Sequence, residues 1–251
     1  MSTAWIDAGR GEAVVALHGI PTSSVLFEPL LPHLKNYRLI APDLIGQGQT
    51  ETPATGPLGH AAYARHLDAF LQKVPPPSFH LIVHDLGGVL GIEWAADNAE
   101  RVRSLVILST TITWSFRVSV LIYAANLIFG RKMLRRALPH TLKRGGGLGD
   151  SLVESWAAPW TRRRLLRGRD HFARRHLRRL RSKLDRLRCP VLLIWGEQDD
   201  IFPIAHARAI RKRLTQAKLV TIPQCGHWST IDAMEEIGNL IAEFLKRNPK
   251  R

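Results

Sequence analysis

The stretch IVHDLGGVLG, residues 82–91, joins an apolar run to a glycine-containing turn with an aspartate at its corner. The run FHLIVH at 79–84 has the length and the apolar character of a buried strand, and a helix is predicted to begin near Val89. Parallel strands need a crossover connection, which is usually a helix, so strand, turn and helix in this order are typical of a parallel sheet. The stretch therefore predicts an α/β fold with Asp85 at the carboxyl end of a strand.

The same alternation of short apolar runs and helix-length segments continues along most of the chain. Segments that start at His60 and at Ile231 show apolar spacings of three and four, as amphipathic helices do. We predict a mostly parallel sheet of about six to seven strands with helices on both faces. The predicted strands are residues 12–17, 37–42, 79–84, 104–109, 191–195 and 218–223.

An insertion interrupts this alternation, which stops after Thr111 and resumes at Cys189. We predict a core formed by residues 1–112 and 189–251, and an inserted helical cap formed by residues 113–188. Within the cap, residues 143–150 (KRGGGLGD) are typical of a flexible joint. The leucines at 177, 180, 184 and 187 form one stripe of an amphipathic helix that we expect to dock on another element.

The positive charge of the chain is concentrated in this insertion. The net charge is +15, and residues 131–188 hold 19 basic and 4 acidic residues, so the remainder is neutral. The simplest interpretation is a solvated cap surface, and its rival is a module that binds nucleic acid or anionic lipid. Aromatic residues are sparse in the arginine-rich tract at 161–183, so we do not expect nucleic acid as a partner. Peripheral membrane contact and self-association stay open.

Several classes of protein are disfavoured by what the sequence contains. Two cysteines, Cys189 and Cys225, do not make a disulfide framework, and the first residues carry no export signal, which favours a cytoplasmic protein. The most apolar stretch, residues 118–129, is about half the length needed to span a bilayer. We expect no metal, because no HExxH pattern or cysteine cluster occurs, and no cofactor.

Asp85 is followed by glycines that allow neighbouring backbones to approach closely, and by a helix start that offers free NH groups. A carboxylate at such a corner is exposed and oriented for chemistry, whereas the alternative is a helix-capping aspartate. In LHGIP (17–21) a proline-constrained turn follows another strand. Its Ile20 amide can point to the same space as the Leu86 amide, which predicts a two-donor oxyanion hole.

Two more motifs follow the last two predicted strands. WGEQDD (195–200) places acids after a strand, and the motif spacing favours Asp199 over Asp200. CGHWS (225–229) places His227 in a loop after the final strand. The order along the chain is then nucleophile, acid, histidine.

Taken together, these motifs resemble the α/β-hydrolase family, and specifically its aspartate-nucleophile branch of epoxide hydrolases and haloalkane dehalogenases. Only about a dozen residues precede the first predicted strand, so we expect the hairpin that usually opens this fold to be abbreviated or missing. In PDLIGQG we expect Asp43 to be structural. The motifs that carry the resemblance are HGIP (18–21), PDLIGQG (42–48), VHDLGG (83–88), AERVRSLVIL (99–108), WGEQD (195–199) and GHW (226–228).

The resemblance implies a two-step hydrolysis. Asp85 displaces a leaving group from saturated carbon and becomes an alkyl ester, because a carboxylate is already anionic at neutral pH. His227, oriented by Asp199, then deprotonates the water that hydrolyses the ester, while the Ile20 and Leu86 amides hold the oxyanion. The implied reactants are a small hydrophobic organic molecule and water.

The leaving group decides the activity. Dehalogenases of the family usually place tryptophan directly after the nucleophile and asparagine beside the oxyanion glycine, where this chain has Leu86 and Ile20. We therefore expect an epoxide opened to a diol, with haloalkane dehalogenation as the first alternative and ester, lactone or carbon–carbon bond hydrolysis as further ones. The cap residues that are candidate leaving-group donors are Tyr123, Trp114, Trp156 and Trp160, with His140, His171 and His176 behind them.

Overall fold

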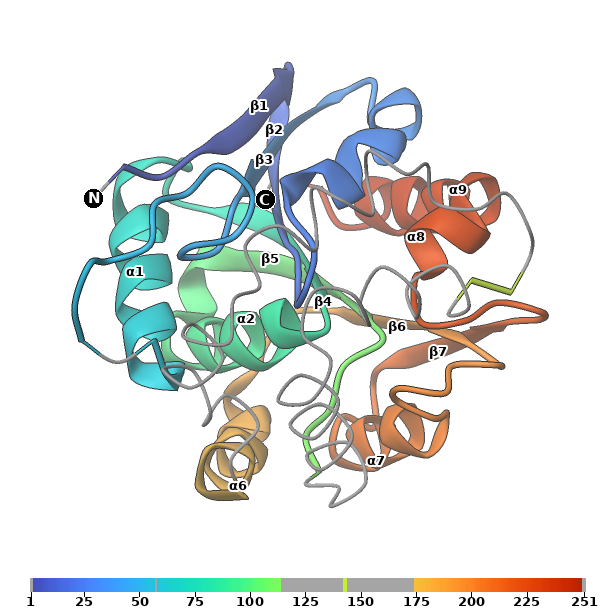
Figure 1. Ribbon diagram of the computed structural model, residues 1–251. Helices are drawn as coiled ribbons and strands as arrows, with labels where there is room; N and C mark the ends of the chain where they lie inside the picture. Colours follow the sequence, from blue (N-terminus) through green and yellow to red (C-terminus); the bar gives the residue numbers. More distant parts are fainter. Residues whose placement is uncertain (1, 57, 114–141, 144–173, 250–251) are drawn as a thin grey trace.

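The computed structural model describes residues 2–56, 58–113, 142–143 and 174–249. At its centre is a seven-stranded sheet with the order β1-β3-β2-β4-β5-β6-β7, in which β1 runs antiparallel to β3 and the other neighbours run parallel (Figure 1). The predicted α/β fold with a mostly parallel sheet is confirmed. The strands are β1 (Trp5–Gly9), β2 (Glu12–Leu17), β3 (Tyr37–Pro42), β4 (Phe79–His84), β5 (Val102–Leu108), β6 (Val191–Gly196) and β7 (Lys218–Ile222).

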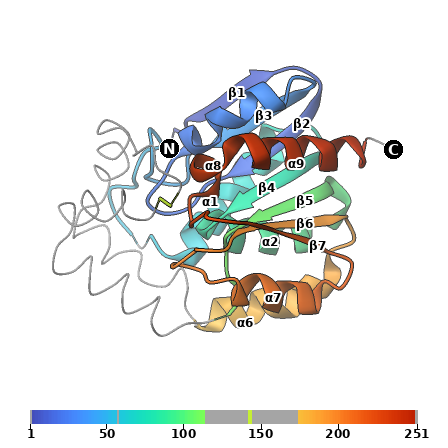
Figure 2. The ribbon, with the colours of Figure 1, turned by 90° about the vertical axis from the view of Figure 1, so that its right-hand side faces the viewer.

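Helices cover both faces of the sheet, as predicted. Figure 2 shows α1, α2, α6 and α7 on one side and α8 and α9 on the other. The α-helices described are α1 (His60–Lys73), α2 (Leu86–Asp97), α6 (Arg174–Lys183), α7 (Ala205–Arg213), α8 (Ser229–Asp232) and α9 (Met234–Lys246). The short 3₁₀ helices are η1 (Ser24–His33), η2 (Ala99–Arg101) and η3 (Leu184–Arg186).

Strands β4 and β6 are buried along their whole length, which explains why they could be predicted from the sequence. Every residue of β4 and β6 is buried, so each reads as an unbroken apolar run. The edge strand β1 alternates between exposed and half-buried positions, and its sequence WIDAG gives no such run. It pairs with β3 instead of forming a hairpin with β2, and we did not predict it.

The helix predicted from Ile231 differs from the structure. The chain forms the single turn α8, leaves helical geometry at Ala233 (φ −142°, ψ 42°) and only then begins α9. The break separates the turn that follows His227 from the long helix that covers the sheet. No glycine or proline lies at the break, so no residue there signals the end of a helix.

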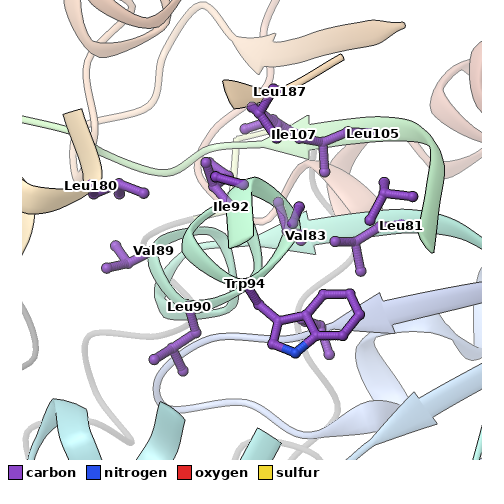
Figure 3. Close-up of a cluster of buried hydrophobic side chains, with 14 of the residues drawn as sticks. Leu81, Val83, Val89, Leu90, Ile92, Trp94, Leu105, Ile107, Leu180 and Leu187 are labelled. Carbon is purple, nitrogen blue, oxygen red and sulfur yellow. The ribbon is translucent and has the colours of Figure 1, made fainter. Parts of the chain in front are cut away.

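Helix α6, the described end of the predicted cap, docks on α2 through the leucine stripe. Leu177, Leu180 and Leu184 are buried with α2 in one apolar cluster. Figure 3 shows Leu180 and Leu187 on the side of α2 that carries Ile92. The domain division at 112 and 188 stays a prediction, since most of the cap lies outside the described residues. Among the described helices, none has the length and apolarity that a membrane crossing requires.

Candidate active site

Asp85 lies on a strained turn between β4 and α2, with φ 50° and ψ −120°. In the described chain the non-glycine residues with positive φ are Asp85, Ser109 and Gln224, which follow β4, β5 and β7 at one edge of the sheet. The turn is fixed by the Asp85 amide donating to the Ser109 carbonyl (3.1 Å) and by the Thr110 hydroxyl donating to the Asp85 carbonyl (2.6 Å). Gly88 is required here, because a Cβ would overlap the Thr110 side chain. Such strain persists where the surroundings hold it, and it gathers at functional sites.

Two backbone amides meet the carboxylate of Asp85. The Ile20 amide donates to Oδ1 at 2.7 Å, and the Leu86 amide also donates to the carboxylate. Gly19 lets the two segments approach, because a Cβ there would overlap Asp85 Oδ1. The His18 ring holds this turn, since its Nδ1–H donates to the Gly19 carbonyl at 2.8 Å. The predicted amide pair of Ile20 and Leu86 is therefore brought to Asp85.

His227 lies between two carboxylates. Its Nδ1 is 3.1 Å from Asp199 Oδ2, and its Nε2 is 3.7 Å from Asp85 Oδ2, which is too long for a direct hydrogen bond. Asp199 is held in turn by the Phe202 amide, which donates to its other carboxylate oxygen, Oδ1, at 2.8 Å. His227 is buried, and within the described part of the chain its Nε2 has no hydrogen-bond partner. The structure thus brings together the three side chains that the sequence singled out.

The three groups shift one another's pKa values. Burial raises the pKa of Asp85, although His227 and the two amides oppose the rise. Burial alone would raise the pKa of Asp199 as well, but His227 and the Phe202 amide outweigh burial and lower it. Asp199 is therefore ionised. Burial would lower the pKa of His227, yet the two carboxylates raise it above its ordinary value. Asp199 therefore supports a proton on the imidazole, whereas Asp85 is held as a poorly solvated carboxylate.

Other acids and histidines from the sequence analysis have different partners. Asp200 accepts from Lys143 Nζ at 2.7 Å and turns away from His227. Asp43 accepts backbone amides on both carboxylate oxygens, which is a structural role, as expected. His176, a candidate donor, stacks on His60 with ring centroids 4.2 Å apart, so the structure does not bring it to Asp85.

The remaining donor candidates lie outside the described residues. Within the described ranges no group of three or more His, Cys, Asp or Glu side chains could hold a metal ion. Thr110 and the role of Ser109 were not predicted, because residues that hold a turn from a neighbouring strand have no motif spacing in the sequence. The predicted candidates outside the described residues are Tyr123, Trp114, Trp156, Trp160, His140 and His171, together with the apolar stretch 118–129.

Comparison with known proteins agrees with this fold. A family model described as alpha/beta hydrolase fold matches residues 12–155 and 159–233. A 2-hydroxymuconate semialdehyde hydrolase from Pseudomonas sp. (strain CF600) is 25% identical, with 95% of this chain and 88% of the relative covered. A cis-3-alkyl-4-alkyloxetan-2-one decarboxylase from Shewanella oneidensis is 26% identical, with 96% and 84% covered. The solved structure of a haloalkane dehalogenase loop variant from Bradyrhizobium elkanii superposes with a TM-score of 0.80 at 23% identity, covering 96% of this chain and 92% of that one, and at this identity it shows the fold alone.

Proposed function

The chain belongs to the α/β-hydrolase family, and from that premise we propose that it hydrolyses its substrate through an alkyl ester on Asp85, opening an epoxide to a diol. The observation that carries the proposal is the open Nε2 of His227, buried and 3.7 Å from Asp85 Oδ2. An imidazole in that position can activate a water beside an ester formed on Asp85.

In the first step, Asp85 attacks saturated carbon. Its Oδ1 accepts from the Ile20 amide at 2.7 Å, so the nucleophile is Oδ2, which faces His227. A new carbon–oxygen bond forms, one epoxide carbon–oxygen bond breaks, and the alkoxide takes a proton from a donor. We assign that donor to the cap, with Tyr123 as the first candidate. The enzyme then carries the whole mass of the epoxide.

In the second step, His227 takes a proton from water, and the water oxygen attacks the ester carbonyl carbon. The bond between that carbon and Oδ2 then breaks, and the departing diol oxygen takes the proton back from His227. The proton left on the new Asp85 carboxyl returns to the donor that protonated the alkoxide, so the carboxylate is restored. The carbonyl oxygen is Oδ1, which already lies against the Ile20 amide, so the amide donors are in place for the developing oxyanion. Esterification also removes the negative charge of Asp85, which is one cause of the raised pKa of His227. The imidazole becomes a free base more readily in the ester than in the resting enzyme.

Epoxide opening is preferred over dehalogenation because of the residues around the amides. Leu86 is fully buried and Ile20 is half-buried, and neither side chain can donate a hydrogen bond to a departing halide. Haloalkane dehalogenation is nevertheless the second candidate, since a dehalogenase shares the fold over nearly the whole chain. Ester or carbon–carbon bond hydrolysis is the third, in view of the curated relative that is a semialdehyde hydrolase.

Replacing His227 by Gln separates these candidates, because it removes the base of the second step and leaves the nucleophile. We expect intact-mass measurement of His227→Gln with styrene oxide to show one adduct of the whole epoxide mass, mapped to Asp85. With 1-bromobutane, a dehalogenase would gain the mass of the haloalkane less hydrogen bromide. His206→Gln is the matched control, because His206 contacts Phe202, as His227 does, but its Nδ1 hydrogen-bonds the Thr111 hydroxyl (2.7 Å) instead of a carboxylate of the site. No adduct from either reagent, together with turnover of p-nitrophenyl butyrate by the wild type, would overturn the ester mechanism.

A further inference from the structure

His84 is a buried histidine that the mechanism above does not use. It is the last residue of β4 and directly precedes Asp85. Its Nε2 lies 3.0 Å from the backbone oxygen of His227, and its ring lies against the rings of His227 and Trp228, with centroid distances of 4.7 and 5.3 Å. Strands β5 and β6 separate β4 from β7, so this contact joins the turn that carries Asp85 to the loop after β7, three strands away in the sheet.

The contact fixes the tautomer of His84, and burial keeps the ring neutral. A carbonyl oxygen can only accept a hydrogen bond, so Nε2 carries the hydrogen and donates it. Burial, reinforced by the neighbouring His227, lowers the pKa of His84 to about 3, so the ring is neutral at any pH at which the enzyme is expected to work. A neutral ring suits this place, because a positive charge would repel the imidazolium of His227.

We propose that His84 is a positioning residue, which holds the backbone of His227 so that the imidazole Nε2 faces the ester on Asp85. Asp199 holds the ring of His227 through Nδ1, at 3.1 Å, and sets its tautomer. His84 holds the main chain of the same residue, and because it is the neighbour of Asp85 it sets the distance between base and nucleophile. This inference rests on the proposed two-step function and adds to it a residue that serves the second step.

The test compares the two amide replacements of His84. The Gln side chain places its amide nitrogen about where imidazole Nε2 lies, whereas the Asn amide reaches only as far as Nδ1. In His84→Asn we expect ester hydrolysis of the styrene oxide adduct to slow by about ten- to a hundredfold, the scale of a misplaced catalytic group, so that the Asp85 ester accumulates. Single-turnover ester formation should stay within about twofold of the wild type, because that step does not use His227. His84→Gln should restore most of the hydrolysis rate.

His80→Asn is the matched control for lost stability. His80 is also buried on β4, but it contacts Ser104 Oγ (2.8 Å) and Glu12 and not the site. We expect this variant to lower the melting temperature without accumulating ester. If His84→Asn does not fold, His84→Phe replaces it, since phenylalanine keeps the ring packing and lacks the donor.

The outcomes separate this inference from the function on which it rests. Accumulation of ester in His227→Gln but not in His84→Asn, or not in His84→Phe where that variant is used instead, would overturn the positioning role alone. Equal slowing of ester formation and hydrolysis, accumulation of ester in His80→Asn, or a His84→Gln variant as defective as His84→Asn would overturn it too. No ester in any variant would overturn the proposed function and this inference together.

Discussion

Helix α2 carries a charged cluster at its start and another toward its end, and the pKa of the central carboxyl is raised in the first and lowered in the second. At its start, Asp85 has a carboxylate that burial disfavours, beside an imidazole whose Nε2 has no hydrogen-bond partner among the described residues. Further along, Glu93 is contacted by Lys183 Nζ (3.0 Å), His60 Nε2 (2.8 Å) and Arg179 Nε (3.1 Å). Burial would raise the pKa of Glu93, but the hydrogen bonds and charges of His60 and Lys183 outweigh it and lower the pKa to about 2.

The difference between the clusters shows how one helix can both hold a reactive carboxylate and bind a neighbouring helix. When the hydrogen bonds and charges around a buried carboxylate do not offset the loss of water, its pKa is raised and it stays reactive. A carboxylate surrounded by cations stabilises the fold and has little left with which to react. The second cluster docks α6 onto the helix that begins beside Asp85.

The largest expected effect is the loss of activity at the first cluster with no loss of stability. We expect Asp85→Asn to lower kcat/KM by about 10⁴-fold or more, because the nucleophile is gone. The melting temperature should equal or exceed that of the wild type, because a poorly solvated charge is removed and Asn tolerates positive φ. Intact mass verifies that the amide has not hydrolysed. A marked loss of stability would contradict the description of Asp85 as a strained functional residue.

Acid should separate the two clusters along the pH axis. Activity needs ionised Asp85, whose pKa is raised, so kcat/KM should fall about tenfold per pH unit below a midpoint that lies above the ordinary value of 3.8. The pKa of Glu93 is lowered from 4.5 to about 2, so its contribution to stability is complete above 4.5 and is lost as the pH falls toward 2. Circular dichroism and activity measured together should show that, just below the activity midpoint, the enzyme is still folded although most of its activity is lost. Simultaneous loss of both signals would contradict the separation.

A smaller effect is expected when the second cluster is broken. Lys183→Met should lower the free energy of unfolding by about 2–3 kcal/mol, because it removes a buried cation between Glu93 and Asp97, while His60 and Arg179 keep part of the compensation. The melting temperature should fall by about 5–10 °C. Turnover at 25 °C should change by less than about twofold. Arg186→Ala is the matched control: this arginine pairs with Asp97 but is 64% exposed, so the loss should be about 0.5 kcal/mol or less.

The sequence predicted the parts of the molecule whose signal is local. The boundaries predicted for residues 12–17, 37–42 and 79–84 agree with β2, β3 and β4, because buried strands are continuous apolar runs. The edge strand β1 and the 3₁₀ helix η1 were not predicted, since β1 is half exposed and η1 contains Pro29 and Pro32. Propensity carries little information at such positions.

The residues of the site also divide into those that a local motif predicts and those that it does not. Asp85, Asp199 and His227 each follow a strand in a short motif, so their meeting at one edge could be predicted from strand order. The contact of His84 with the His227 carbonyl and the cluster around Glu93 could not, because their members lie up to 143 residues apart and no spacing relates them. The cap residues that would choose the substrate lie outside the described part of the chain.

The most direct test of the alkyl-ester mechanism is turnover of styrene oxide in ¹⁸O-labelled water, followed by mass measurement of the peptide that contains Asp85. Hydrolysis at the ester carbonyl predicts that this peptide gains first one and then two heavy oxygens over multiple turnovers, and that the same peptide from His227→Gln gains none. Heavy oxygen found in the diol while the Asp85 peptide stays unlabelled throughout turnover would contradict the ester on Asp85.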